Sequence, residues 1–159
     1  MARKIVLFAA LLFAALAAGG GYVVWWDYNP DGMAAAFYVE KMQYAIRVIG
    51  SPLFAVVGLG TFFTIISTFL ARGDRPSFYF LIGASICFFT VALITRFGNV
   101  PILNQIETWN ISSPPSNWKE LADKWWWIHN VRFAVQITGL SLLIWAVLGR
   151  AAPRSKAVS

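Results

Sequence analysis

Four side chains late in the sequence are spaced so that they could do chemistry together. Trp125, His129, Arg132 and Gln136 follow one another at intervals of four, three and four residues, which places them on one face of an α-helix. An imidazole can accept a proton near neutral pH, a guanidinium can hold an oxyanion, and an indole can stack on a flat ligand. His129 and Arg132 are therefore the candidate catalytic centre, with Trp125 as a wall.

Two further polar stretches accompany this face. The sequence RFGNVPILNQIETWN (96–110) follows a run, 76–95, without any charged residue. A helix-like stretch before position 50 carries Glu40, Gln43 and Arg47 on one face. Because a buried guanidinium needs a carboxylate or several carbonyls, we expect one connected polar network with few unpaired groups. It would contain Arg47, Arg96, Asn99, Asn104, Glu107, His129 and Arg132, with Glu40, Gln43 and Trp125 beside it at the binding site.

The elements that must position these groups are apolar helices. Hydrophobic residues make up 58% of the 159-residue chain and charged residues 13%, which is too apolar for an ordinary soluble domain. Four blocks, at about 4–26, 50–71, 76–96 and 130–149, are long enough to cross a hydrocarbon core of roughly 30 Å. We predict an all-α integral membrane protein with a single domain, 1–159. It would be a four-transmembrane-helix bundle with an outer amphipathic helix before the second span and an outer polar cap segment after the third.

The positive charges predict the orientation of this bundle. The flanks of the spans that share one side hold seven basic residues and one acidic residue, Asp74, whereas the other side holds six of each. The seven are Arg3, Lys4, Arg72, Arg75, Arg150, Arg154 and Lys156. Both termini are therefore expected in the cytoplasm, and the outward-facing sides of the spans are expected to contact membrane lipid. No basic stripe stands apart from the membrane flanks, so nucleic acid is not an expected partner. A cleaved signal peptide is the alternative for the first span, but its apolar run continues to Trp26, long enough to span.

Metal and redox chemistry have little support in the sequence. Glu40, Glu107 and His129 are of the types that bind iron or zinc, but the Glu-x-x-His pairs typical of helical di-iron sites are missing. One histidine offers a single axial ligand to haem, and the one cysteine, Cys87, cannot form a dithiol pair. We expect no metal at the site.

Four segments resemble a family of small bacterial four-helix membrane proteins linked to anthrone oxygenases. They are FYVEKMQYAIR (37–47), LITRFGNVPILNQIETW (93–109), PPSNWKELADKWW (114–126) and HNVR (129–132). The resemblance implies oxidation of an activated CH₂ group between aromatic rings, without a bound cofactor, in a lipophilic aromatic or quinol-type molecule. It further implies that His129 is the base, that Arg132, Arg96, Asn99 and Asn104 stabilise the enolate oxygen, and that tryptophans stack on the substrate.

Two other functions stay open at this stage. The chain could be a non-catalytic membrane module, either a partner subunit or a binder of lipids or small molecules. A small transporter is disfavoured because there are four spans and no pair of broken helices, although oligomerisation is left open. The sequence alone names neither the substrate nor the oligomeric state.

Overall fold

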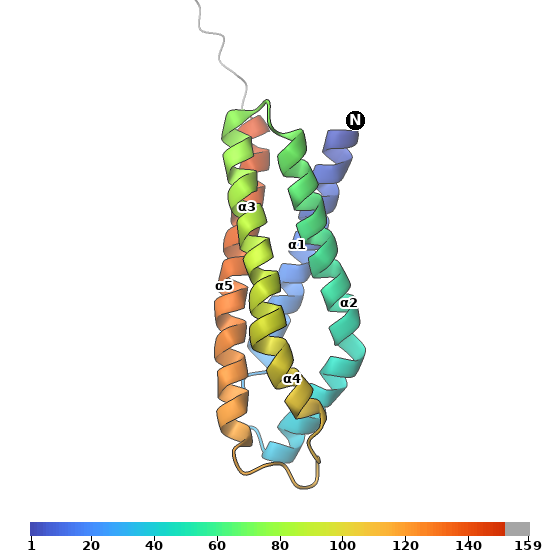
Figure 1. Cartoon of the computed structure of the whole chain (residues 1–159), viewed down its shortest axis with the longest axis vertical. Coiled ribbons are helices and arrows are strands. Elements are labelled where there is room, and N and C mark those ends of the chain that lie inside the picture. Colours follow the sequence, from blue (N-terminus) through green and yellow to red (C-terminus); the bar gives the residue numbers. More distant parts are fainter. Residues whose placement is uncertain (152–159) are drawn as a thin grey trace, which may run out of the picture.

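The computed structural model describes residues 1–151 as helices joined by short loops (Figure 1). Four helical stretches, Ala2–Asp27, Ala35–Leu70, Arg75–Glu107 and Trp118–Gly149, are long and apolar enough to cross a membrane. The predicted all-α fold with four membrane helices is therefore confirmed. The elements are α1 (Ala2–Asp27), α2 (Ala35–Leu70), α3 (Arg75–Ile94), η1 (Thr95–Asn99), α4 (Val100–Glu107) and α5 (Trp118–Ala151). Arg154 and Lys156, which entered the orientation argument, lie outside the described residues.

The four long helices form a ring in the order α1, α2, α3, α5. The largest interfaces join α3 to α5 and α1 to α2, while α2 and α5 scarcely touch because they lie across the ring from each other. The start of α1, the turn between α2 and α3, and the final turns of α5 all lie at one end of the bundle (Figure 1). There, Arg3 forms an ion pair with Asp74 at 3.5 Å. The other end, which carries the loops 28–34 and 108–117, is called the outer end below.

Helix α2 is longer than the sequence suggested. The predicted amphipathic helix and the second span form one uninterrupted helix of 36 residues with Pro52 inside it. A proline removes one backbone hydrogen bond and bends a helix without having to end it, and Figure 1 shows that α2 is bowed. Beyond the bend, the outer part of α2 contacts α4.

The third membrane helix does not stop at Arg96. It passes through a π-helical segment, Thr95–Asn99, and continues as α4 to Glu107. Pro101 has no N–H to donate to the carbonyl four residues earlier, which disfavours regular α-helical bonding at this point. A π segment absorbs such a defect and often lies at a functional site. Most of the predicted polar cap segment is thus an extension of the helix.

Two apolar clusters hold the ring together. The inner one includes Leu7, Leu81, Phe88 and Leu143, and the outer one includes Tyr38, Met42, Ile102, Ile106 and Trp125. Helices α1 and α2 approach closely at Gly60, where a Cβ atom would lie 3.3 Å from the backbone nitrogen of Ala14. Such close approach through small residues is typical of helix pairs in membranes. Large apolar side chains such as Phe8, Phe62 and Trp145 point outward, as a lipid-facing surface requires.

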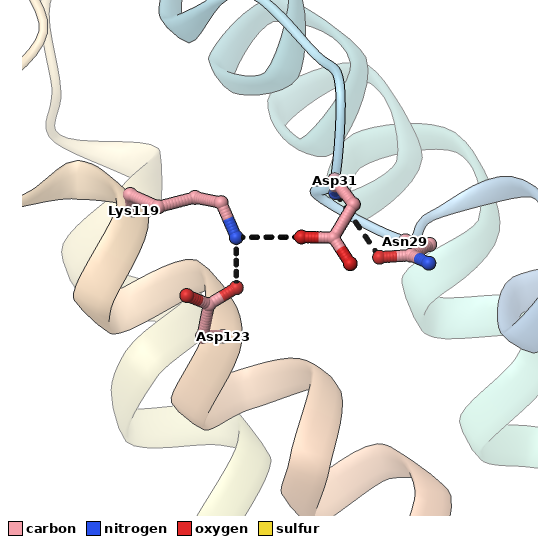
Figure 2. Close-up of polar contacts among 4 residues, drawn as sticks. All are labelled: Asn29, Asp31, Lys119 and Asp123. Carbon is pink, nitrogen blue, oxygen red and sulfur yellow. Dashed lines mark hydrogen bonds and ion pairs between the residues drawn. The ribbon is translucent and has the colours of Figure 1, made fainter.

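At the outer end, an exposed group of charges ties the 28–34 loop to the start of α5. Lys119 lies 2.9 Å from an Asp31 carboxylate oxygen and also bonds to Asp123, one turn further along α5. The Asn29 side chain accepts a hydrogen bond from the backbone N–H of Asp31 at 3.0 Å. Figure 2 shows Lys119 between the two carboxylates. These contacts fix the loop above the buried polar groups described next.

Candidate functional site

A cavity of about 540 Å³ lies beneath the outer end of the bundle. Most of its wall is apolar and comes from α2, with Val24 of α1 and Ala92 of α3. Apart from Thr61 of α2, its polar groups come from η1, which continues α3, and from α5, which lies across the ring from α2. They are Thr95, Arg96, Asn99, Trp125 and Arg132, and Tyr28 lies at the outer edge. The cavity thus combines a large apolar wall with a small group of polar side chains, called the polar corner below.

Arg132 and His129 form the buried centre of this corner. A terminal guanidinium nitrogen of Arg132 lies 2.8 Å from Nδ1 of His129. Because a guanidinium has only donors, Nδ1 must accept this hydrogen bond. The ring proton is then on Nε2, which donates to the carbonyl oxygen of Gly21 at 3.2 Å. His129 is therefore a neutral imidazole that links α1 to Arg132.

The orientation of His129 is fixed by packing as well as by hydrogen bonds. Its ring stacks between Trp125, at a centroid distance of 5.5 Å, and Phe133, at 6.3 Å. Helix α1 can come close because Gly21 has no side chain: a Cβ atom there would lie 3.0 Å from the Phe133 ring. His129 is fully buried and is absent from the residues that line the cavity. Arg132 is the member of the pair that meets the cavity.

Arg132 has fewer partners than a buried charge requires. Its side chain is 8% exposed, its Nε–H has no hydrogen-bond partner, and none of the ion pairs within the described part of the chain involves it. The expected carboxylate neighbour is thus missing from residues 1–149. An unpaired buried charge is costly, so this corner is suited to an anionic or oxygen-rich ligand.

Two residues of η1 extend the polar corner. Asn99 is buried and donates to the carbonyl oxygen of Trp125 at 3.5 Å, while its own carbonyl oxygen lacks a partner. Arg96 lies at a more exposed part of the same wall. Thr95 returns its hydroxyl to the Val91 carbonyl at 2.7 Å. The π segment therefore presents one amide and one guanidinium to the cavity.

Gln43 has a structural role at this end of the molecule. Its Nε2 lies 3.0 Å from the carbonyl oxygen of Ile106 and 2.8 Å from that of Trp109. Carbonyls at a helix C-terminus lack partners within the helix, so Gln43 caps α4 and ties it to α2. This contact positions η1 indirectly, because α4 continues from it.

The remaining predicted site residues lie apart from this corner. The side chains of Glu40, Arg47, Asn104 and Glu107 are exposed and do not line the cavity. Within the described residues, no hydrogen bond or ion pair joins them to His129 or Arg132. The predicted network is therefore divided: Arg132, Asn99, Trp125 and Arg96 line the cavity, His129 lies directly behind Arg132, and the others lie apart. Nor do Glu40, Glu107 and His129 meet, and no other trio of metal-binding side chains gathers among the described residues.

Some site residues were not anticipated from the sequence. Gly21 supplies the carbonyl that holds His129, and Tyr28 borders the cavity from the loop after α1. Burial, the Asp27 carboxylate and Tyr44 raise the pKa of the Tyr28 phenol, so it stays protonated at neutral pH. The glycine run at 19–21 was a usable signal, since glycine in a membrane helix marks close helix approach. No comparable signal marked the apolar cavity wall on α2.

Comparison with known proteins identifies one family. No curated protein and no solved structure matches the chain. One family model, described as anthrone oxygenase, matches residues 41–142. This range holds most of α2, all of α3, η1 and α4, and the His129–Arg132 pair. It covers well over half of the sequence, and the chain therefore belongs to the anthrone oxygenase family.

Proposed function

We propose that the chain is a membrane oxygenase that binds a lipophilic aromatic or quinol-type molecule in this cavity. The observation that carries the proposal is Arg132: a buried guanidinium, free of any carboxylate among the described residues, on the wall of an otherwise apolar cavity. The volume of about 540 Å³ falls within the range of small-molecule sites, roughly 300–1,000 Å³. An aromatic ring system with one ionisable oxygen fits both the apolar wall and the charge.

In the reaction we propose, Arg132 first makes the substrate more acidic. Its free Nε–H donates to the ring oxygen, which becomes an enolate oxygen when the neighbouring CH₂ group loses a proton. Stabilising this developing negative charge in a site shielded from water lowers the barrier to deprotonation. The second N–H of the Asn99 amide and the Arg96 guanidinium can stabilise the same enolate oxygen.

His129 is the proposed proton acceptor. A C–H bond of the CH₂ group breaks, its proton goes to Nδ1, and the electron pair spreads to the enolate oxygen. At rest, Nδ1 accepts a hydrogen bond from a terminal N–H of Arg132. Arg132 must therefore first turn that terminal N–H away from Nδ1 and toward the substrate. The same movement would expose Nδ1, so substrate binding and base release are coupled.

Reaction with molecular oxygen completes the proposed chemistry. The carbanion carbon forms a C–O bond with O₂, and the resulting peroxide takes up a proton. Loss of the second C–H proton, with cleavage of the O–O bond, leaves a ketone and releases water. Overall, one CH₂ group and one O₂ become one C=O group and one water, so atoms and electrons balance.

A second candidate function is binding without chemistry. It is favoured by one observation: both ring nitrogens of His129 are engaged in the resting structure and the ring is buried. Such a protein would hold an acidic aromatic molecule at Arg132 for another membrane enzyme. His129 would then serve only to orient the guanidinium.

Oxygen uptake by the protein in lipid nanodiscs separates the two functions. With an anthrone as substrate, we expect uptake by the wild-type protein and none by His129→Gln, because glutamine can still accept from Arg132 but cannot take a proton. Substrate affinity should change little in this variant. Glu40→Gln, on an exposed position, is the control. Full turnover by His129→Gln would refute the base role, and binding without uptake by the wild-type protein would favour the second function.

The proposed setting is a bacterial inner membrane with both termini in the cytoplasm. In that orientation the inner end of the bundle, with Arg3, Arg72 and Arg75, faces the cytoplasm, as the positive-inside rule favours. The outer end, with the 108–117 loop, would then face the periplasm. The polar corner of the cavity would lie near the outer membrane–water boundary.

A further inference from the structure

The cavity is much longer on its α2 side than on the opposite side. Residues of α2 line it every three or four positions from Met42 to Ile65, which is about 35 Å of helix at 1.5 Å per residue. The facing residues of α3, η1 and α4 extend only from Ala92 to Leu103, or about 17 Å. Near Arg132 the cavity is therefore walled on both sides, and beyond Ala92 it continues as an apolar groove along α2.

This groove has room in it and is open to the surroundings. Gly50 and Gly58 both line it, and a Cβ atom built on either would meet nothing within 4 Å. Phe54 and Phe62, which also line it, are 50% and 55% exposed. In a membrane, side chains at this depth face hydrocarbon rather than water. The deep part of the groove is thus a slot that opens sideways into the bilayer.

The two ends of the cavity differ sharply in chemistry. One end presents the unpaired Nε–H of Arg132 and the unpaired carbonyl oxygen of Asn99. Past Val57, the lining residues of α2 are only Gly58, Thr61, Phe62 and Ile65. The Thr61 hydroxyl donates to the Val57 carbonyl at 2.9 Å, so this end has no free polar group. A compact ring system would occupy only the polar end. A molecule with a charged head and an apolar tail complements both ends at once.

We infer that the natural ligand is a head-and-tail molecule: an aromatic head with an ionisable oxygen at Arg132, and a long alkyl or isoprenoid tail that lies along α2 past Gly58. This rests on the proposed function for the position of the head, and adds the tail. The tail leaves the site sideways, so the ligand can pass between bilayer and cavity without crossing water.

Two probes and two matched glycine variants test the tail. The probes are a dihydroxyanthrone and the same molecule with a decyl chain, and their dissociation constants are measured with the protein in nanodiscs. Gly58→Phe fills the groove below the head, while Gly19→Phe adds the same ring on α1, where a Cβ atom also meets nothing and which does not line this cavity. We expect Gly58→Phe to weaken binding of the tailed probe at least tenfold and binding of the tail-free probe less than twofold. Gly19→Phe should change neither.

The outcomes separate the inference from the function on which it rests. Equal effects of Gly58→Phe on the affinities of the two probes, whether large or small, would overturn the inference that a tail lies in the groove. Arg132→Met should weaken the binding of both probes, and if it weakens the binding of neither, the proposed head site is wrong. Should Gly58→Phe fail to fold, a photoreactive group at the tip of the decyl chain serves with the wild-type protein. Labelling should fall on residues 57–65 of α2, and labelling confined to other segments, as expected for a tail that stays in bulk lipid, would overturn the inference.

Discussion

The carbonyl oxygen of Gly21 in α1 accepts a hydrogen bond from His129 in α5 at 3.2 Å, across 108 positions of sequence. This contact requires the two helices to be close, and Gly21 permits that closeness. A side chain at this position would push against Phe133 and Gln136 at 3.0 and 3.2 Å. The orientation of the imidazole, and through it that of Arg132, depends on the absence of one methyl group.

We therefore expect Gly21→Ala to destabilise the protein by about 1–3 kcal/mol, the usual cost of overpacking. Thermal melting in nanodiscs measures this. Gly19→Ala is the matched control, since its added methyl group meets no neighbour and should leave the melting temperature unchanged or slightly higher. Equal melting temperatures for the two variants would show that the α1–α5 contact is looser than described.

Arg132→Met should make the fold more stable while it removes the binding site. The substitution deletes a buried charge that lacks a carboxylate partner among the described residues and keeps much of the side-chain volume. Removing such a charge should stabilise the folded state by about 1 kcal/mol or more. The affinity for an anthrone should fall at least tenfold. A lower melting temperature would instead show that losing the hydrogen bond to Nδ1 of His129 costs more than removing the buried charge gains.

Gln43→Leu should loosen α4 without unfolding the bundle. The variant removes the Gln43 donor from the carbonyls of Ile106 and Trp109, of which the Ile106 carbonyl keeps the N–H of Trp109, at a cost of about 1–3 kcal/mol. Hydrogen exchange of residues 100–109 should become faster, while that of α1 stays slow. Glu40→Gln, one turn earlier and exposed, should leave both rates as they are. Slow exchange in α4 of Gln43→Leu would contradict the capping role.

Cysteine labelling tests the orientation. In a Cys87→Ala background, Ser116→Cys lies in the outer loop and Gly73→Cys in the turn at the opposite end, and both positions are exposed. In intact cells, a membrane-impermeant maleimide should label position 116 and spare position 73. Labelling of position 73 alone would reverse the proposed orientation.

The parts of the fold that depend on local composition could be predicted from the sequence. Long apolar blocks predicted the four membrane helices, and the spacing of Trp125, His129 and Arg132 predicted that they share one face of α5. Both signals lie within a single helix, where sequence distance fixes spatial distance. The prediction of a catalytic role for His129 and Arg132 stays a prediction.

The divided polar network could not be predicted, because it depends on how one segment continues. The sequence predicts a polar cap over the bundle after the third span, in which Asn99 and Asn104 could both turn inward. In the structure, Asn99 ends the π segment and Asn104 belongs to a helix. Five residues of helix carry two side chains to largely opposite faces, so Asn99 is buried and Asn104 exposed. The α2 groove could not be predicted, because no pattern of residue types in the sequence marks an empty volume between helices.

The polar face of α5 also bears on how the chain is made. Arg132, His129 and Gln136 lie in the least apolar of the four candidate spanning helices, and ionisable side chains within a lone membrane helix are costly to insert. Helix α5 follows the other three spanning helices in the sequence, so we expect α1 with its Gly21 carbonyl and η1 with Asn99 to enter the bilayer before it. The earlier helices would then offer α5 a packing surface, and its polar face would enter the bundle without facing lipid alone.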